Sequence, residues 1–216
     1  MRPDEDPGVP RRLARGEAFV YVLPRRDDTQ FKIGFSRDPV ERWQTLHRRF
    51  FEFFDLDRGI LVATDRVSDA RRIERSLLSE FSAYTSLAPL RVPASAGGSN
   101  EWFRGVLDDA VASAAVHAER SGLVVHRPAS AWLRTVLIDR TDLLFAWTRR
   151  MLDLIEFERH NPAGEKSDGA TRYERSLGDA LDAMVALNID FTPHVPTDVV
   201  AWQVARRAAA TGDWTL

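Results

Sequence analysis

The 216-residue chain contains no cysteine, which excludes disulfide bonds, thiolate metal sites and cysteine nucleophiles. It also lacks any apolar run approaching the ~18 residues that a membrane-spanning helix requires, and residues 1–7 have no apolar core of the kind found in secretory signals. We therefore expect a cytoplasmic protein that does not act at a membrane. Its content of 44% hydrophobic and 29% charged residues is typical of a globular protein.

The chain also lacks an excess of charge of one sign, since it has 30 basic and 32 acidic residues. This balance argues against binding of a polyanion over the whole chain. The charge is unevenly distributed, however. Residues 1–104 hold 18 basic and 16 acidic side chains, whereas residues 105–216 hold 12 and 16. Lysine is scarce, with only Lys32 and Lys166, so almost every basic side chain is an arginine. Arginine is suited to bidentate phosphate contacts, but genome base composition explains so broad a bias more simply.

Strands are predicted near the beginning of the chain. Residues 1–16 contain three prolines and no apolar period, which predicts a flexible arm. Runs of β-branched and aromatic residues then predict strands at 18–23, 30–35 and 60–63, of which the first two form a hairpin.

Helices are predicted between and after these strands. Asp38 followed by Pro39 is a favourable N-cap with proline at the first helical position, and amphipathic patterns over 67–83 and about 106–120 predict two more helices. We therefore expect an α+β domain over 17–121, with a small three-stranded antiparallel sheet flanked by helices.

The second half of the chain predicts an all-helical domain over 128–216. Its expected helices cover 131–159, 171–187 and 197–210. The acidic balance and several tryptophans favour contact with protein over contact with DNA. Recognition of a partner, packing onto the first domain and self-association are all compatible with this pattern.

Five short motifs follow one another in the first domain, each of them weak by itself. In chain order they are Val20-Tyr21-Val22, Lys32-Ile33-Gly34-Phe35-Ser36, Asp38-Pro39-Val40-Glu41-Arg42, Glu74, and Glu101-Trp102-Phe103. Their order and spacing resemble the GIY-YIG nuclease superfamily, in particular its phage and bacterial branch with a Lys-Ile-Gly second triplet. The resemblance covers about residues 18–105. It implies the GIY-YIG-like fold, a DNA endonuclease and, loosely, a phage or host-defence setting.

The resemblance implies that Tyr21, Arg42 and Glu74 carry phosphodiester hydrolysis. Such hydrolysis needs an activated water and positive charge at the non-bridging phosphate oxygens. Arg42 would clamp the phosphate by a charge-assisted fork, Glu74 would hold a divalent cation, Mg²⁺ or Mn²⁺, and Tyr21 would help to activate water. A tyrosine with its usual pKa of ~10 is a poor base. Lys32, on the partner strand, is therefore expected to bias Tyr21 or to contact phosphate.

One position departs from the family pattern in a way that bears on activity. Leu78 stands where many members of the branch have a histidine, four residues after the helix glutamate. His47, a little over one turn beyond Arg42, is the candidate to replace that histidine. Nearby basic side chains are candidate DNA contacts, namely Arg37, Arg48 and Arg49.

The same residues also have purely structural interpretations. Tyr21 in an apolar strand is typical of a core tyrosine, and Gly34 of a β-bulge or strand end. Glu74 has three arginines beside it with which a surface ion pair is compatible, Arg71, Arg72 and Arg75.

Two other functions are therefore kept beside the nuclease hypothesis. The first is a catalytically inactive domain of the same fold that binds nucleic acid or protein, and the second is a structural subunit assembled through its helical half. Convergence of Tyr21, Arg42 and Glu74 on one cleft would favour catalysis, whereas an ion pair that locks Glu74 to a neighbouring arginine would argue against it.

Overall fold

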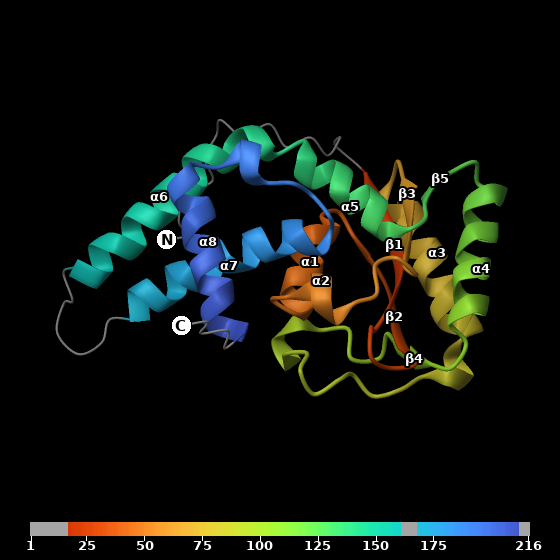
Figure 1. Ribbon diagram of the computed structural model, residues 1–216. Coiled ribbons are helices and arrows are strands. Elements are labelled where there is room, and N and C mark those ends of the chain that lie inside the picture. Colours follow the sequence, from red (N-terminus) through yellow and green to blue (C-terminus); the bar gives the residue numbers. More distant parts are fainter. Residues whose placement is uncertain (1–16, 161–167, 212–216) are drawn as a thin grey trace, which may run out of the picture. The chain divides into compact units, whose positions relative to one another are not determined.

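The computed structural model describes residues 17–160 and 168–211, and the chain divides into two compact units, Met1–Ala129 and Ser130–Leu216 (Figure 1). The predicted arm at residues 1–16 lies outside the described residues. No helix within the described ranges is both long and apolar enough to cross a bilayer.

The first unit is built on a five-stranded antiparallel sheet with strand order β4-β2-β1-β3-β5. Its strands are β1 (Ala18–Pro24), β2 (Gln30–Ser36), β3 (Ile60–Thr64), β4 (Trp102–Arg104) and β5 (Val124–His126). The three central strands lie where the sequence predicts them, but the prediction of a three-stranded sheet was wrong because both edge strands were missed. β4 and β5 have only three residues each, too few to show an alternation of apolar and polar side chains.

One face of this sheet holds the main apolar core. There the helices α3 (Val67–Glu80) and α4 (Leu107–Arg120) pack against the strands (Figure 1). Buried aliphatic side chains from both layers meet in a single cluster, in which Ile33 and Val62 of the strands lie with Ile73 of α3. Successive strand residues point to opposite faces, so this core accounts for every second residue of β1 and β2.

The opposite face carries Tyr21 and Lys32 and lies beside two short helices, α1 (Pro39–Leu46) and α2 (Phe50–Phe53). Asp38 caps α1 as predicted, because its side chain accepts a hydrogen bond from the Glu41 backbone N–H at 3.0 Å, and Pro39 occupies the first turn. The ring of Trp43 in α1 meets Tyr21 edge to face, with ring centroids 6.0 Å apart.

A long segment connects α3 to β4, and its residues 85–100 are called the 85–100 segment below. It contains two 3₁₀ turns, η1 (Ser82–Tyr84) and η2 (Ala94–Ala96). Gly97 and Gly98 follow η2 with φ of 67° and 68°, a left-handed conformation that glycine adopts without strain.

The second unit is helical, as predicted. After α5 (Ala129–Ile138), which begins at the boundary between the units, come α6 (Thr141–His160), α7 (Asp168–Ala186), η3 (Thr192–His194) and α8 (Thr197–Thr211). α6 packs along α7 and buries Leu152, Ile155, Leu177 and Leu181.

The predicted single helix over 131–159 is wrong, because α5 and α6 are separate helices. The break falls between Ile138 and Thr141, where the Thr141 hydroxyl donates a hydrogen bond to the Ile138 carbonyl at 2.8 Å. That carbonyl is one of those left without an intrahelical partner at the end of α5. Neither proline nor glycine marks the break in the sequence.

Candidate active site

Tyr21 lies near the middle of β1 and is only 1% exposed. Its hydroxyl makes no hydrogen bond of regular geometry with any described residue. Burial raises the pKa of the phenol, and the positive charge and close approach of Arg42 oppose this rise without reversing it. Tyr21 therefore keeps its proton at neutral pH, and a buried hydroxyl with unused hydrogen-bonding capacity is available to another group.

Gly34 faces Tyr21 across the β1–β2 pair. A Cβ atom at this position would lie 2.6 Å from the Tyr21 hydroxyl oxygen and 2.8 Å from Cζ, closer than real Cβ contacts allow. The tyrosine ring thus occupies the space above the glycine. The structural interpretation of Gly34 as a bulge or strand end misses this role, which is to let Tyr21 lie flat across β2.

Arg42 extends from α1 toward the segment that precedes β4. Its Nη1 donates hydrogen bonds to the Ala96 carbonyl oxygen and, at 3.4 Å, to the Thr45 hydroxyl. Ala96 belongs to η2, so the 85–100 segment lies against the Arg42 guanidinium, which is predicted to bind phosphate. Any anion bound by Arg42 competes with this carbonyl.

Lys32 is fully buried, with no exposed surface. Its Nζ donates to the Glu101 carboxylate at 2.7 Å and to the Gly98 carbonyl at 3.1 Å, and it lies 5.4 Å from the centroid of the Trp102 ring. Burial lowers the pKa of Lys32, while Glu101 opposes the shift. The lysine is thus placed to hold Glu101 and the segment that contains Gly98, and the structure gives it no exposed atom with which to contact phosphate.

Gly98 is a second position at which a side chain would not fit. A Cβ there would collide with the Glu101 carboxylate and lie 2.8 Å from Lys32 Nζ. The Lys32–Glu101 contact therefore depends on the bare backbone at Gly98. Neither Gly98 nor Glu101 is among the site residues predicted from the sequence. The glycine pair and the Glu101-Trp102-Phe103 motif are the signals that mark them.

Glu74 lies on α3 and is 9% exposed. Burial and the negative charge of Glu101 raise its pKa from 4.5 to about 7, against the opposing effects of the Phe35 backbone N–H, Lys32 and Arg42. Among the described residues no ion pair joins Glu74 to the arginines beside it. Arg72 instead pairs with Asp69 at 3.2 Å, and Arg75 donates to the Arg71 carbonyl.

The charged groups of the cluster act on one another. Arg42, Glu74 and Glu101 all affect the pKa of Tyr21, and Lys32, Arg42 and Glu101 all affect that of Glu74. Four predicted residues from β1, β2, α1 and α3 are thus brought together. These four residues and Glu101 form what is called the Tyr21 cluster below. Leu78 packs against the apolar core.

The other predicted site residues lie in different surroundings. His47 stacks on Phe53, with centroids 4.6 Å apart and planes 10° apart. Arg49 is engaged by the Glu52 carboxylate at 2.7 Å and lies over Phe51. Arg37 and Arg48 are exposed.

Comparison with protein families gives one match. A family profile described as the T5orf172 domain matches residues 18–118, a segment that includes every member of the Tyr21 cluster. This domain is a phage-associated, nuclease-like DNA-binding domain, so the segment is similar to a domain of that kind. No curated protein and no solved structure matches the chain. The resemblance to GIY-YIG nucleases stays a prediction.

Proposed function

We propose that the first unit is a metal-dependent endonuclease that hydrolyses phosphodiester bonds in DNA. The observation that carries this proposal is the convergence of Tyr21, Arg42 and Glu74, from three separate elements, in one group of coupled charges. The similarity of residues 18–118 to a nuclease-like DNA-binding domain supports both the reaction class and DNA as the partner.

The acidic members of the Tyr21 cluster fit a hard divalent cation. Glu74 and Glu101 repel each other, and their repulsion contributes to the raised pKa of Glu74. Within the part of the chain that the structure describes, no group of three or more histidine, aspartate or glutamate side chains could hold a metal ion. Mg²⁺ keeps several waters and often takes only one or two carboxylates, so Glu74, with Glu101 near it, suits this ion or Mn²⁺. When bound, the cation would supply positive charge at the phosphate and acidify water.

Each remaining residue has a role that its surroundings support. Arg42 exchanges the Ala96 carbonyl for a non-bridging phosphate oxygen and stabilises the charge that develops there. The Tyr21 hydroxyl, protonated because it is buried, orients the attacking water rather than removing its proton as a phenolate. The water oxygen then bonds to phosphorus and its proton passes to solvent, while the bond to the leaving oxygen breaks and that oxygen takes up a proton from solvent. Lys32 positions Glu101 and is not itself a phosphate ligand.

A second function is favoured by the enclosure of the same cluster. Tyr21 and Lys32 are buried, and Arg42 is occupied by a backbone carbonyl. Such an arrangement also suits a domain that has kept the fold and binds nucleic acid or protein without cleaving.

Cleavage of single-stranded and duplex DNA in the presence of Mg²⁺ or Mn²⁺ tests the proposal. We expect the Glu74→Gln and Tyr21→Phe variants to lose roughly 100-fold or more in rate, as is typical when groups that bind the metal or orient the reacting water are removed. Glu80→Gln is the matched control, because Glu80 lies on the same helix and binds Ser113. Its rate should equal that of the wild type.

The outcomes separate the two functions. Metal-dependent cutting that both cluster variants abolish would establish the nuclease. Cutting that survives Glu74→Gln would rule out the assigned metal ligand. DNA binding that weakens with salt, with no cutting of either substrate, would favour the non-cleaving domain.

A further inference from the structure

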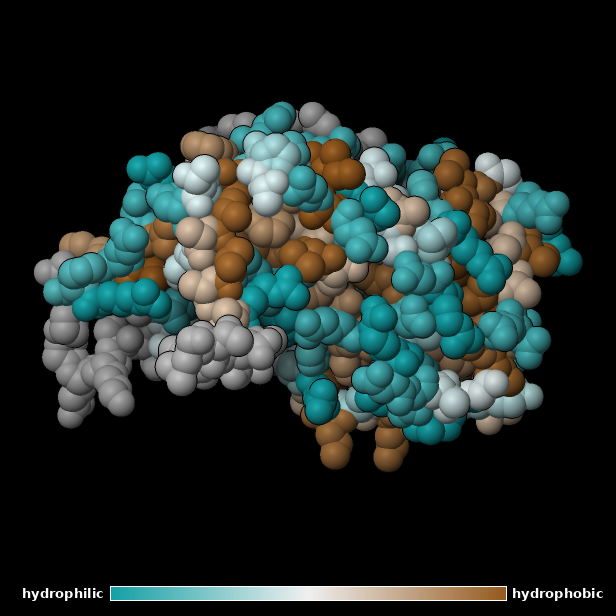
Figure 2. Space-filling view, viewed as in Figure 1, coloured by the Kyte–Doolittle hydropathy of each residue, from teal (hydrophilic) through white to brown (hydrophobic). Residues whose placement is uncertain are grey.

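Two leucines project fully into solvent from the segment between α3 and β4. Leu87 is 88% exposed and Leu90 is 104% exposed, more than any other large hydrophobic residue that the structure describes. Figure 2 shows hydrophobic groups projecting at the lower edge of the view, below a surface that is otherwise largely hydrophilic there. Single exposed apolar side chains are common on protein surfaces, so these two leucines point to a function only together with the anchored backbone and the hollow beside them.

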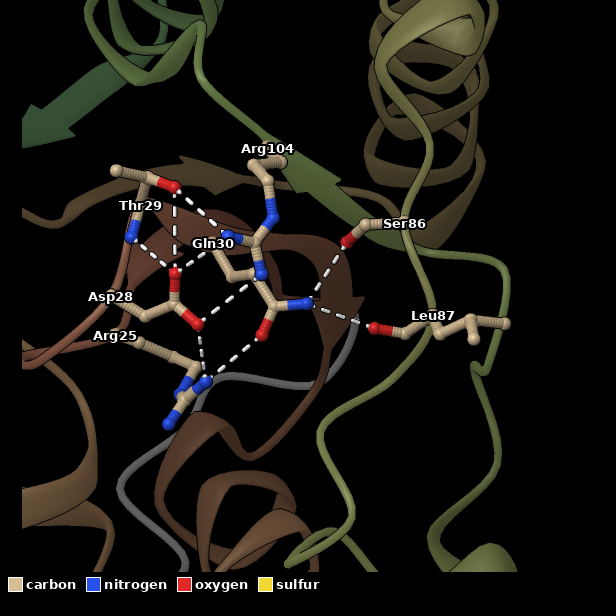
Figure 3. A network of polar contacts seen from close by, with 7 residues as sticks. All are labelled: Arg25, Asp28, Thr29, Gln30, Ser86, Leu87 and Arg104. Atoms are coloured by element: carbon tan, nitrogen blue, oxygen red, sulfur yellow. Dashed lines mark hydrogen bonds and ion pairs between the residues drawn. The ribbon is translucent and has the colours of Figure 1, made fainter.

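The backbone that carries these leucines is anchored to the sheet. Gln30, which is buried in β2, donates from Nε2 to the Leu87 carbonyl at 3.0 Å and to the Ser86 hydroxyl at 3.2 Å (Figure 3). The Ser86 backbone N–H donates to the Trp102 carbonyl of β4 at 2.8 Å. Leu87 is therefore held in a fixed position at the edge of the sheet.

Charged residues support this anchor. Arg25 donates from Nη1 to the Gln30 side-chain oxygen at 2.9 Å and to Asp28 at 2.8 Å, and Arg104 pairs with Asp28 at 3.0 Å (Figure 3). Burial opposes ionisation of Asp28, but the Thr29 N–H and the two arginines lower its pKa overall. The network thus fixes Gln30, and through it the backbone at Ser86 and Leu87.

A polar hollow with both basic and acidic side chains lies beside the same segment. It has a volume of about 200 Å³ and is lined by Arg25, Asp27, His47, Glu52, Phe53 and Arg91. Glu52 accepts hydrogen bonds from Arg49. Arg91 directly follows Leu90 in the chain and makes no hydrogen bond or ion pair within the described residues.

Two nitrogen atoms of the residues that line this hollow are buried without a hydrogen-bond acceptor. They are Nε of Arg25 and Nδ1 of His47, and the structure offers neither of them a partner in its described part. The Phe53 ring holds both side chains, since His47 stacks on it and the Arg25 guanidinium lies 5.3 Å from its centroid. An Arg Nε–H, an imidazole N–H and the Arg91 guanidinium are donors that together match the oxygens of a phosphate group.

We propose that this surface distorts DNA. The hollow lined by Arg25, His47 and Arg91 binds one phosphate of the backbone, and Leu87 and Leu90 insert between neighbouring base pairs and unstack them. Apolar side chains act as such wedges in proteins that bend DNA. This inference deepens the endonuclease proposed above and rests on it for the choice of DNA as partner.

The surroundings favour DNA over a protein partner. Two isolated leucines offer far less area than the roughly 1,000 Å² that a stable protein interface buries, and the adjoining nitrogens call for an anion. The segment also continues to Ala96 and Gly98, whose carbonyls contact Arg42 and Lys32. A wedge at Leu87 and Leu90 therefore lies on the same stretch of chain that borders the Tyr21 cluster.

Fluorescence of 2-aminopurine tests the wedge, because this base analogue brightens when it unstacks. A set of duplexes carries the probe at successive positions, and the full chain is added in EDTA so that no cleavage occurs. We expect a severalfold rise at one or two adjacent positions. The Leu87→Ala, Leu90→Ala double variant should lose this rise while its Kd changes less than tenfold. Val124→Ala, an exposed residue on the edge strand β5, is the matched control and should keep the rise.

The phosphate contact is tested with Arg91→Ala. We expect this variant to bind duplex DNA roughly three- to tenfold more weakly and to lower the slope of log Kd against log salt by about one, the change for one lost phosphate contact. At saturating protein the fluorescence rise should remain. Arg120→Ala, an exposed arginine at the end of α4, serves as the control and should bind like the wild type.

Three results would overturn the inference. In the first, the wild type binds duplex DNA without a fluorescence change at any position. In the second, the fluorescence rise survives in the double leucine variant. In the third, no base unstacks, and the wild type forms a concentration-dependent dimer that the double leucine variant alone abolishes. The last result would assign the leucines to a second copy of the chain. The endonuclease proposal fails separately, since unstacking without metal-dependent cutting contradicts that proposal alone.

Discussion

The two faces of the sheet in the first unit differ in what they bury. The face toward α3 and α4 buries aliphatic and aromatic side chains that need no hydrogen-bond partner. The opposite face buries the Tyr21 hydroxyl and the Trp102 indole N–H without a hydrogen bond of regular geometry to any residue that the structure describes, and it also contains a fully buried lysine. Burying polar groups in this way costs free energy, whereas burying apolar groups carries no such cost.

This contrast teaches where stability and function reside. A fold that needed only stability would place apolar residues on both faces, as packing favours. The polar face instead keeps a protonated tyrosine and a lysine with a lowered pKa, and Glu74 of α3, which accepts the Phe35 backbone N–H near the end of β2, adds a carboxylate with a raised pKa to the same cluster. Perturbed groups of this kind gather at functional sites.

Removing a large side chain from the apolar face gives the largest expected loss of stability. Ile33 is fully buried in the core cluster, so Ile33→Ala should lower the free energy of unfolding by about 2–5 kcal/mol through lost burial and a cavity. Denaturant unfolding measures this change. DNA cleavage per folded molecule should be unchanged, because Ile33 points away from the Tyr21 cluster. A specific loss of cleavage would show that the two faces are not independent.

The pH dependence of stability tests the Tyr21 cluster through Glu74. Its pKa is about 7 in the folded protein against 4.5 as the ordinary value, so the folded state binds more protons between these values. The stability contributed by protonated Glu74 is fully present below about pH 4.5 and is lost as the pH rises through about 7. A shift of one pKa unit corresponds to about 1.36 kcal/mol. As the pH rises over this interval, the free energy of unfolding of Glu74→Gln should therefore increase by up to roughly 3 kcal/mol relative to that of the wild type.

Unfolding by urea at a series of pH values, without metal, measures the difference between Glu74→Gln and wild type. Glu80→Gln serves as the reference, because Glu80 is exposed and bound to Ser113, and its difference from wild type should stay constant. Mg²⁺ bound at Glu74 would favour the carboxylate and restore wild-type stability near pH 8. A difference that does not vary with pH would contradict the raised pKa.

Substitution of Gly34 tests the close approach of Tyr21. We expect Gly34→Ala to destabilise the protein by about 1–3 kcal/mol, because the new Cβ would lie 2.6 Å from the tyrosine hydroxyl. In a Tyr21→Ala background the same substitution should cost much less, and the double-mutant cycle measures this coupling. Equal costs in both backgrounds would mean that Tyr21 is not the group displaced.

The sequence predicts the parts of the fold whose signals are local. Alternating and apolar runs mark the three central strands, and Asp38-Pro39 marks the start of α1. The sequence does not predict the edge strands β4 and β5, because three residues become a strand only by pairing with longer neighbours. The sequence does not predict the break between α5 and α6, because a hydrogen bond from a threonine hydroxyl ends α5 there and no proline or glycine marks the position.

The sequence likewise indicates the main residues of the candidate site but not the contacts among them. The motif order identifies Tyr21, Lys32, Arg42 and Glu74, which the fold brings together. It does not reveal that Lys32 is buried against Glu101, or that His47 lies in a separate hollow. These arrangements depend on where the 85–100 segment and α2 pack, and contacts of that kind leave no periodic pattern in the sequence.

The smallest expected effect concerns the helix that carries Arg42. Asp38 accepts the Glu41 N–H at the start of α1, so Asp38→Ala should cost about 1 kcal/mol of stability, whereas Asp38→Asn keeps an acceptor and should cost only a few tenths. Thermal unfolding of the two variants measures the difference. α1 places Arg42 near Tyr21, so cleavage should fall more for Asp38→Ala than for Asp38→Asn. Ile33→Ala, despite its larger loss of stability, should leave cleavage per folded molecule intact. Equal cleavage by all three would mean that the cap stabilises α1 without setting the position of Arg42.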